Sequence, residues 1–289
     1  MNYILHLLIY LDIYIIITLS LNLLIGYSGL FQLAHAAYYG IGAYTTALLM
    51  VRLGWGFVPS LISSIVVTGC LSLFVSLPAW RFRKDYFVIL SLAMQVAIYS
   101  LLYNWIDLTN GPFGITGIPR PGILGYQINT LFKMFSLSTA LTLVCGAIVF
   151  ILLRSPWGRV LNAMRDDELA ARGLGKNTRL FKVQAFFIAC AMVAIAGSLY
   201  ATYVSYIDPT SFTLDESILM ISMIIVGGTG NFRGPIVGAL TLIAIPEILR
   251  FLYIPDTIAA NIRLLIYGLL IITMVHLRPQ GLAGKYRFK

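Results

Sequence analysis

The sequence predicts an all-α protein, a polytopic bundle of transmembrane helices that forms one domain over residues 1–289. The mean hydropathy is +0.88 and only 11% of the residues are charged, values that do not suit a soluble core. Most charge-free runs approach the ~20 residues that a helix needs to cross a bilayer. These runs are rich in Leu, Ile and Val and do not alternate, so a membrane β-barrel is excluded.

About nine membrane segments with glycine-broken helices are expected. The charge-free run over 13–51 is too long for one span, and we divide it at "IGYSG" (Ile25–Gly29), where glycines permit a sharp turn. The short segment over 214–230 ends in "GGTGNFRGP" and either crosses the membrane or enters it and returns. The expected segments are 3–25, 30–51, 57–80, 86–106, 131–154, 181–204, 214–230, 234–253 and 259–277.

The N-terminal run is expected to be a retained first span. A signal peptide requires basic residues at its start and a small-residue cleavage site. This run has no Lys or Arg before Arg52 and no such cleavage site. Cys70, Cys145 and Cys190 all fall inside apolar runs, so we predict buried thiols and neither disulfides nor metal ligands. The His and carboxylate residues form no nucleophile or metal pattern, so no catalytic residue, no metal site and no enzyme activity are predicted.

The basic residues predict the orientation in the membrane, because cytoplasmic loops carry an excess of Lys and Arg. The segments that would lie together on one face of the membrane hold 15 of the 20 Lys and Arg residues, and we place these segments and the C-terminus in the cytoplasm. This placement accounts for the net charge of +9 without nucleic acid as a partner. Two loops, 106–129 and 206–217, then lie on the opposite side; the first contains Pro and Gly, and the second contains Pro. The cytoplasmic segments are "RFRK" (81–84), Arg154 with the segment 155–182, Arg233 and the tail from Arg278.

Two glycine-containing stretches resemble each other. The first glycine break is "IGYSGLF" (Ile25–Phe31), and the second glycine break is "VGGTGNF" (Val226–Phe232). Broken segments at matching places in two halves of a transporter mark its translocation path, whereas small or polar residues between helices also serve packing alone. The candidate path residues are Ser28, Gly29, Gln32, His35, Gly227, Gly228, Thr229 and Gly230.

Residues 155–182 form a charged island that carries nine of the chain's 31 Asp, Glu, Lys and Arg side chains. We expect one helix over 158–175, which begins after Gly158 and ends at glycines. Ala170 and Ala171 give this helix a small-residue face that suits docking in a groove on a partner. The alternative is a solvated helix that rests on lipid headgroups.

Six motifs stand in order along almost the whole chain. They are "LNLLIGYSGLFQLAHAAYYGIGAY" (21–44), "DYFVILSLAMQ" (85–95), "LTNGPFGITGIPRP" (108–121), "GRVLNAMRDDELAARGLGKN" (158–177), "VGGTGNFRGPIVGA" (226–239) and "RPQGL" (278–282). Together they resemble the permease subunits of branched-chain amino-acid ABC importers, in particular the LivM-like member of the permease pair. The resemblance is specific for the family and less specific for the substrate, since related permeases carry urea, amides or other amino acids.

The resemblance implies an ABC importer permease fold and a function in ATP-driven import, foremost of branched-chain amino acids. It implies that the charged island contains the coupling helix that docks on an ATPase subunit, with Glu168, Ala170, Ala171 and Gly173 similar to an E-x-A-A-x-G pattern. The implied coupling residues are Arg165, Asp166, Asp167, Glu168, Ala170, Ala171 and Gly173.

The same resemblance implies the partners and the location. The sequence contains no G-x-x-x-x-G-K-[ST] motif, so we expect two separate ATPase subunits to bind ATP and this chain to hold no cofactor. The other implied partners are a homologous second permease, a periplasmic or lipid-anchored substrate-binding protein, and membrane lipid. The implied location is the inner or plasma membrane of a bacterium or archaeon.

Other mechanisms stay open from the residues alone. An ion-coupled secondary transporter needs an ionisable residue at mid-membrane. Asp12, Glu247 and His35 are the candidates, and each is placed near a predicted helix end. A passive channel or a purely structural subunit would not need a docking helix. Arg120, in an outer loop, is either a contact for a binding protein or a solvated loop charge.

Overall fold

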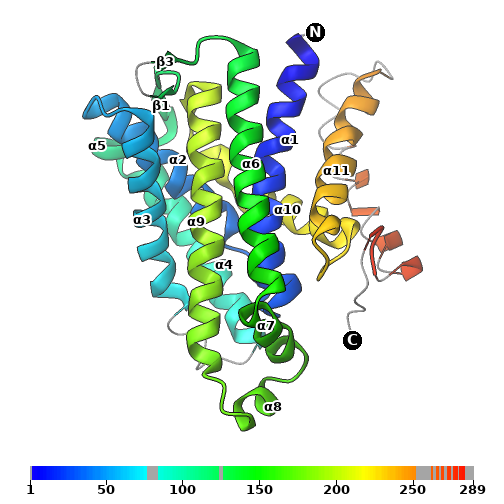
Figure 1. The fold of residues 1–289 in the computed structure, drawn as a ribbon. Helices are drawn as coiled ribbons and strands as arrows, with labels where there is room; N and C mark the ends of the chain where they lie inside the picture. Colours follow the sequence, from blue (N-terminus) through cyan, green and yellow to red (C-terminus); the bar gives the residue numbers. More distant parts are fainter. Residues whose placement is uncertain are drawn as a thin grey trace.

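The computed structural model describes residues 2–76, 84–123 and 126–251, together with 262, 265–266, 268–269, 272–274, 276–278 and 280–283. Parts of the predicted segment 259–277, and most of "RFRK" (81–84) and of the tail from Arg278, lie outside the described residues. The described part is a bundle of helices with four strands of two residues each (Figure 1). The all-α class is therefore confirmed.

Eight helices of 14 residues or more make up most of the described bundle. They are α1 (Asn2–Asn22), α2 (His35–Arg52), α3 (Phe57–Ser76), α4 (Lys84–Asn104), α6 (Leu131–Arg154), α9 (Thr178–Val204), α10 (Leu214–Gly227) and α11 (Arg233–Phe251). Five stretches within the described residues are long and apolar enough to cross a membrane, and the predicted total of nine segments is not established. These five are Asn2–Tyr27, Phe57–Phe74, Tyr86–Asn104, Leu131–Arg154 and Thr178–Val204.

Helix α2 lies inside the bundle, in contact with α3, α4 and α9. Its backbone approaches α9 closely because both helices have glycine at the crossing. A Cβ atom at Gly42 would lie 2.6 Å from the Cα atom of Ala194, and one at Gly197 would lie 2.4 Å from the carbonyl oxygen of Tyr39. Any larger residue at Gly42 or Gly197 would push the two helices apart.

The first glycine break ends the first helix, as predicted. Helix α1 passes into a π-helical turn, η1 (Leu23–Tyr27), and the chain then turns at Gly29, whose φ of +68° favours glycine. The second glycine break joins α10 to α11, and these two helices pack against each other. Helix α10 has 14 residues, about 21 Å at 1.5 Å per residue, and is shorter than a bilayer core of about 30 Å.

The loops 106–129 and 206–217 meet at one end of the bundle, and the charged island lies at the other end (Figure 1). Strand β1 (Ile115–Thr116) of the first loop pairs antiparallel with β4 (Tyr206–Ile207) of the second. The N-terminus of α1 also lies at this loop end. Loops and island thus lie at opposite ends of the bundle, and the side of the membrane that each faces stays a prediction. The other short elements of the loops are α5 (Ile106–Thr109), η3 (Gly111–Phe113), β2 (Gly122–Ile123), β3 (Tyr126–Gln127) and η4 (Pro209–Phe212).

The prediction of three buried thiols is wrong for one cysteine. Cys145 and Cys190 are buried, but Cys70 is exposed on α3 because its side of that helix faces away from the bundle. Among the described residues, no group of three or more His, Cys, Asp and Glu side chains is arranged to hold a metal ion.

The position predicted for Asp12 near a helix end is also wrong. Asp12 lies near the middle of the 26-residue helical stretch Asn2–Tyr27, and it lies near the middle of the predicted segment 3–25 as well. Its carboxylate is buried and accepts hydrogen bonds from Ser138, at 2.7 Å, and from Thr139, at 2.8 Å. Both donors belong to α6, so this carboxylate joins α1 to α6.

Candidate functional site

The charged island contains two helices, α7 (Pro156–Asp166) and α8 (Glu168–Gly173). The predicted single helix over 158–175 is therefore wrong. Asp167 interrupts it with an extended backbone, at φ −150° and ψ 105°. The Oδ1 atom of Asp167 accepts hydrogen bonds from the backbone N–H groups of Leu169 (2.9 Å) and Ala170 (3.0 Å). Asp167 thus caps the start of α8, which is the position that an Asp side chain stabilises best.

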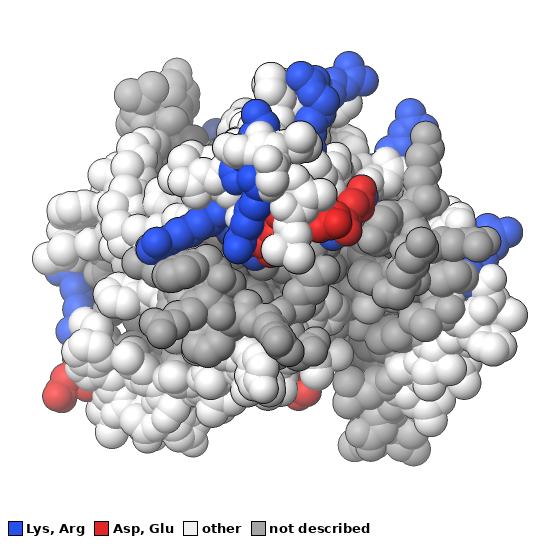
Figure 2. All heavy atoms as spheres, turned by 90° about the horizontal axis from the view of Figure 1, so that it is seen from below, with Lys and Arg blue, Asp and Glu red and all other residues white. Residues whose placement is uncertain are grey.

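Helix α8 presents apolar side chains at the end of the molecule that is remote from the loops. Leu169 and Leu174 are 77% and 79% exposed, and Ala170 between them is exposed as well. Ala171 is only 3% exposed, so it faces the rest of the chain. Figure 2 views this end, where Lys and Arg side chains stand beside a smaller group of Asp and Glu. The predicted small-residue face is therefore divided: Ala170 is available to a partner and Ala171 is not.

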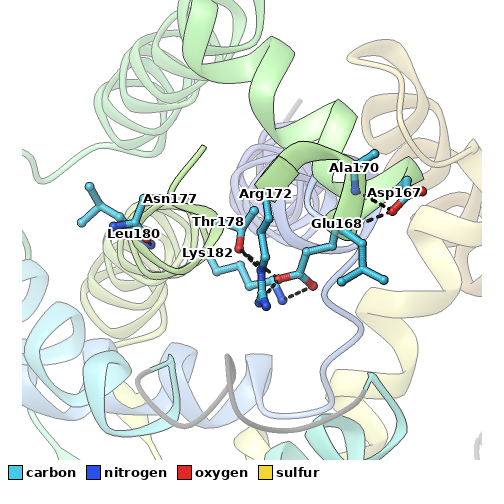
Figure 3. A network of polar contacts seen from close by, with 9 residues as sticks. Asp167, Glu168, Ala170, Arg172, Asn177, Thr178, Leu180 and Lys182 are labelled. Atoms are coloured by element: carbon cyan, nitrogen blue, oxygen red, sulfur yellow. Dashed lines mark hydrogen bonds and ion pairs between the residues drawn. The ribbon is translucent and has the colours of Figure 1, made fainter. Parts of the chain in front are cut away.

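Glu168 joins α8 to the first two turns of α9 (Figure 3). Its carboxylate accepts from Arg172 and from Lys182, both at 2.7 Å, and from the Thr178 hydroxyl at 3.1 Å. Burial raises the pKa of Glu168, but the hydrogen bonds and charges of Lys182 and Arg172 outweigh burial and hold this pKa below its ordinary value. Glu168 is therefore a carboxylate at neutral pH and sets the position of α8 relative to the bundle.

Arg165 points from α7 into the first glycine break. Its Nη1 atom donates a hydrogen bond to the carbonyl oxygen of Gly26 at 2.7 Å, and its Nε atom donates to Asp166 at 3.1 Å. The side chain is 13% exposed, whereas that of Asp166 is 60% exposed. A Cβ atom at Gly29 would lie 3.2 Å from the Cγ atom of Arg165. The charged island thus contacts the segment where α1 ends.

Asn22 connects the first glycine break to the second. Its Oδ1 atom accepts from the backbone N–H of Gly230 at 3.1 Å, and its Nδ2 atom donates to the carbonyl oxygen of Asn231 at 3.0 Å. A Cβ atom at Gly26 would lie 2.5 Å from the Gly230 nitrogen, so glycine permits this approach. The charged island, the first glycine break and the second glycine break are therefore connected by one continuous set of contacts.

A short C-terminal segment completes this set. The backbone N–H groups of Leu282 and Ala283 each donate, at 2.9 Å, to the carbonyl oxygens of Val226 and Gly227. A Cβ atom at Gly281 would lie 2.5 Å from the Cα atom of Gly228. The end of α10 is thus held from two sides, by α1 and by residues 281–283.

The predicted path residues of the first half lie in tightly packed surroundings. Ser28 is buried and donates to the Leu23 carbonyl oxygen at 2.8 Å. Gln32 and His35 are fully buried, with 2.9 Å between Gln32 Nε2 and His35 Nδ1. The Nε2 atom of His35 lies 2.8 Å from the Ser20 hydroxyl, so both ring nitrogens of His35 have partners. These contacts join α1 to α2, and a role in the path stays a prediction.

The predicted path residues of the second half are equally enclosed. Gly227 lies against Gly234, where a Cβ atom would meet the carbonyl oxygen at 2.0 Å. Gly228 and Gly230 have φ angles of +105° and +70°, which favour glycine, and Thr229 between them is buried. The structure therefore brings the two groups of predicted residues together through Gly26, Asn22 and Gly230.

Sequence reasoning missed Asn22, which bridges the breaks, and a polar face near the start of α1. His6, Tyr10 and Tyr14 stand four residues apart, a spacing that places them on one side of a helix. This spacing is the signal that could have found them, because a face of His and Tyr in an apolar span needs polar surroundings.

Comparison with known proteins identifies the family. The profile described as "Branched-chain amino acid transport system / permease component" matches residues 3–275. The chain belongs to this permease family. It is 34% identical to the high-affinity branched-chain amino acid transport system permease protein LivM of Escherichia coli K12, over 93% of this chain and 67% of the relative. The resemblance found in the sequence motifs is thereby confirmed, and the permease is a multi-pass protein of the inner membrane.

Two further relatives cover nearly the whole permease. The probable branched-chain amino acid transport permease protein LivM of Methanocaldococcus jannaschii is 25% identical, over 95% of this chain and 91% of the relative. The permease protein LivH of Escherichia coli K12, of the high-affinity branched-chain amino acid system, is 23% identical over 94% of this chain and 91% of the relative. No solved structure matches the permease.

Proposed function

We propose that this permease is a membrane subunit of an ATP-driven importer of branched-chain amino acids. In this proposal it forms the translocation path with a homologous second permease and receives its movement from separate ATPase subunits. A substrate-binding protein delivers the amino acid to the loop end. Family membership supports the membrane role, and the similarity to both LivM and LivH supports a pair of related permeases.

The observation that supports the coupling role is that the charged island both exposes apolar residues outside the bundle and contacts the first glycine break inside it. Helix α8 exposes Leu169, Ala170 and Leu174 outside the bundle, while Arg165 of α7 contacts the first glycine break. A helix with exposed apolar residues suits a groove on a partner protein. A displacement of the island would act on the end of α1 and, through Asn22, on the second glycine break. Such rigid-body transmission is a known means of switching between states.

Reconstitution into liposomes tests this function. Liposomes that contain this permease, the second permease and the ATPase subunits should take up radiolabelled L-leucine only with ATP and the binding protein. Liposomes that contain this permease alone should show no uptake. Saturable leucine uptake by this permease alone, driven by an ion gradient, would contradict the proposal.

The position of Asp12 favours an ion-coupled carrier as the second candidate function. It is a buried carboxylate in the middle of a membrane helix, and ionisable residues at such positions often bind a coupling ion. If this candidate is correct, uptake should follow a proton or sodium gradient and Asp12→Asn should abolish that dependence. If Asp12 only joins α1 to α6, the substitution should leave ATP-driven uptake independent of any gradient.

A further inference from the structure

Two cavities flank the first half of α1. One, of about 460 Å³, lies between α1, α6, α9 and the loop that carries Arg120. The other, of about 400 Å³, lies between α1, α10 and α11 and reaches Glu247. The cavities share Tyr3, His6 and Tyr10, so they adjoin along this stretch of α1. Neither cavity is lined by a residue of the two glycine breaks.

The α1–α10–α11 cavity combines apolar walls with one carboxylate. Leu219, Met223 and Leu242 line its apolar part. The Oε2 atom of Glu247 is buried and has no hydrogen-bond partner among the described residues. Burial of an unpaired polar atom in apolar surroundings costs free energy, and ionisable groups inside membrane proteins pair with opposite charge or mark a substrate pathway. The surroundings of Glu247 therefore suit a cationic hydrogen-bond donor.

Tyrosine rings add to this preference for a cation. Tyr10 and Tyr14 stand one helical turn apart and both line the cavity. The Tyr14 hydroxyl donates to the Oε1 atom of Glu216 at 2.7 Å, which fixes the ring of Tyr14 in place. Aromatic faces attract ammonium groups, most strongly where water is excluded.

We propose that the α1–α10–α11 cavity binds an aliphatic α-amino acid during its passage through the membrane, with Glu247 as the counter-ion of the α-ammonium group. The apolar wall accommodates the aliphatic side chain, and the volume lies within the range of small-ligand sites. The inference rests on the proposed function, because it takes an amino acid as the transported molecule.

The adjoining cavity offers the opposite charge. Arg120 lines it at the loop end, and Thr130 and Thr202 line it as well. His6, in the shared part, is hydrogen-bonded to the Tyr203 hydroxyl. An amino acid that enters from the loop end would meet a guanidinium group, which attracts its carboxylate, before it reaches Glu247.

Binding to the complete transporter tests the site. Tritiated L-leucine is bound to the detergent-solubilised assembly of both permeases and the ATPase subunits, without the binding protein. The competitors are 3-methylbutylamine, which keeps the ammonium group, and 4-methylpentanoate, which keeps the carboxylate. The amine should compete at least about tenfold better than the acid, because only the amine donates a charged hydrogen bond to Glu247.

Substitutions at Glu247 complete the test. Glu247→Gln should lower leucine affinity by about tenfold or more, and Glu247→Asp should restore part of it. Asp215→Asn is the matched control, since Asp215 is an exposed acid in the first turn of α10 and should not affect binding. The site is overturned by equal leucine affinity in wild type and Glu247→Gln, by absence of leucine binding in the wild type, or by stronger competition from the acid.

A structural role for Glu247 and a failure of the proposed function give different results. If Glu247 only stabilises the fold, Glu247→Gln lowers the melting temperature of the assembly and leaves the order of the two competitors unchanged, which overturns the site. ATP-driven leucine uptake is measured on the same wild-type preparation. If the wild-type assembly shows no uptake, the proposed function is rejected. If the wild type shows normal uptake but Glu247→Gln binds leucine with the same affinity as the wild type, only the Glu247 site is rejected.

Discussion

Arg165 and Gly26 lie 139 positions apart in the sequence, and a 2.7 Å hydrogen bond joins the Nη1 atom of Arg165 to the carbonyl oxygen of Gly26. The bond links α7 of the charged island to the π-helical turn that ends α1. Gly26 in turn approaches Gly230 so closely that a Cβ atom at Gly26 would lie 2.5 Å from the Gly230 nitrogen. Helix α7 is therefore in direct contact with the first glycine break, which in turn contacts the second.

The close approach at Gly26 predicts a large effect for a single methyl group. In Gly26→Ala the new Cβ atom would lie 2.1 Å from Asn22 Oδ1 and 2.5 Å from the Gly230 nitrogen, so the breaks must separate. We expect a loss of about 1 to 3 kcal/mol in stability. Gly146→Ala is the control, because its nearest contact, Phe232, lies at an ordinary 3.8 Å. Equal melting temperatures for the two variants, measured on the purified transporter, would contradict the close packing.

Ala170 and Ala171 should respond differently to the same substitution. Ala170→Arg adds bulk and charge to an exposed surface, so the permease should insert and fold but recover far less ATPase subunit on purification. Ala171→Arg places the same group in a buried position, so this variant should lower the amount of folded permease itself. Lys176→Ala, an exposed change beside α8, is the control for both. Normal ATPase recovery and normal uptake with Ala170→Arg would show that α8 is a solvated helix.

Several features of this site were predictable from local sequence. The motif "IGYSG" predicted the first glycine break because glycines interrupt an otherwise unbroken apolar run. The charge density of 155–182 predicted a segment outside the membrane. The division of the island at Asp167 was not predicted, since Asp in a charged stretch is compatible with either a helix or a cap until its side-chain hydrogen bonds are known.

Other features depend on tertiary contacts that no local pattern encodes. Asn22 and Gly230 are 208 positions apart, and no sequence pattern around either residue predicts the hydrogen bond between them. The interior position of α2 was not predicted, because which helices enclose it depends on the packing of the whole bundle. The burial of Ala171 beside the exposed Ala170 depends on how Glu168 fixes α8 to α9, a contact between side chains 14 positions apart.

The lowered pKa of Glu168 predicts the pH dependence of the island. A carboxyl group whose folded-state pKa is depressed stabilises the fold above its unfolded pKa, and this stabilisation is lost as the pH falls through the folded value. Amide hydrogen exchange of α8, corrected for intrinsic rates, should therefore accelerate on acidification from pH 7 to about pH 3. Glu168→Gln should exchange rapidly at both pH values. Exchange in the wild type that does not change with pH would contradict the role of the ion pairs with Arg172 and Lys182.

Cysteine labelling tests the orientation. Thr210 at the loop end and Asn177 in the island are both exposed, so Cys at either position is accessible to solvent. A membrane-impermeant maleimide added outside the cell should modify Thr210→Cys and spare Asn177→Cys, because basic loops favour the cytoplasm. Cys70 is first replaced by Ser, so that the introduced cysteine is the only exposed one among the described residues. The reverse labelling pattern would place the charged island outside the cell.

The ratio of leucine transported to ATP hydrolysed, measured for Arg165→Ala in the reconstituted transporter, tests the central claim most directly. The exposed surface of α8 is intact in this variant, so the ATPase subunits should bind and hydrolyse ATP. Because the variant loses the charged hydrogen bond to Gly26, we expect the ratio to fall about tenfold or more. Arg159→Ala, an exposed change on the same helix, should keep the wild-type ratio. A wild-type ratio in Arg165→Ala would contradict the claim that the charged island drives the membrane helices through the first glycine break.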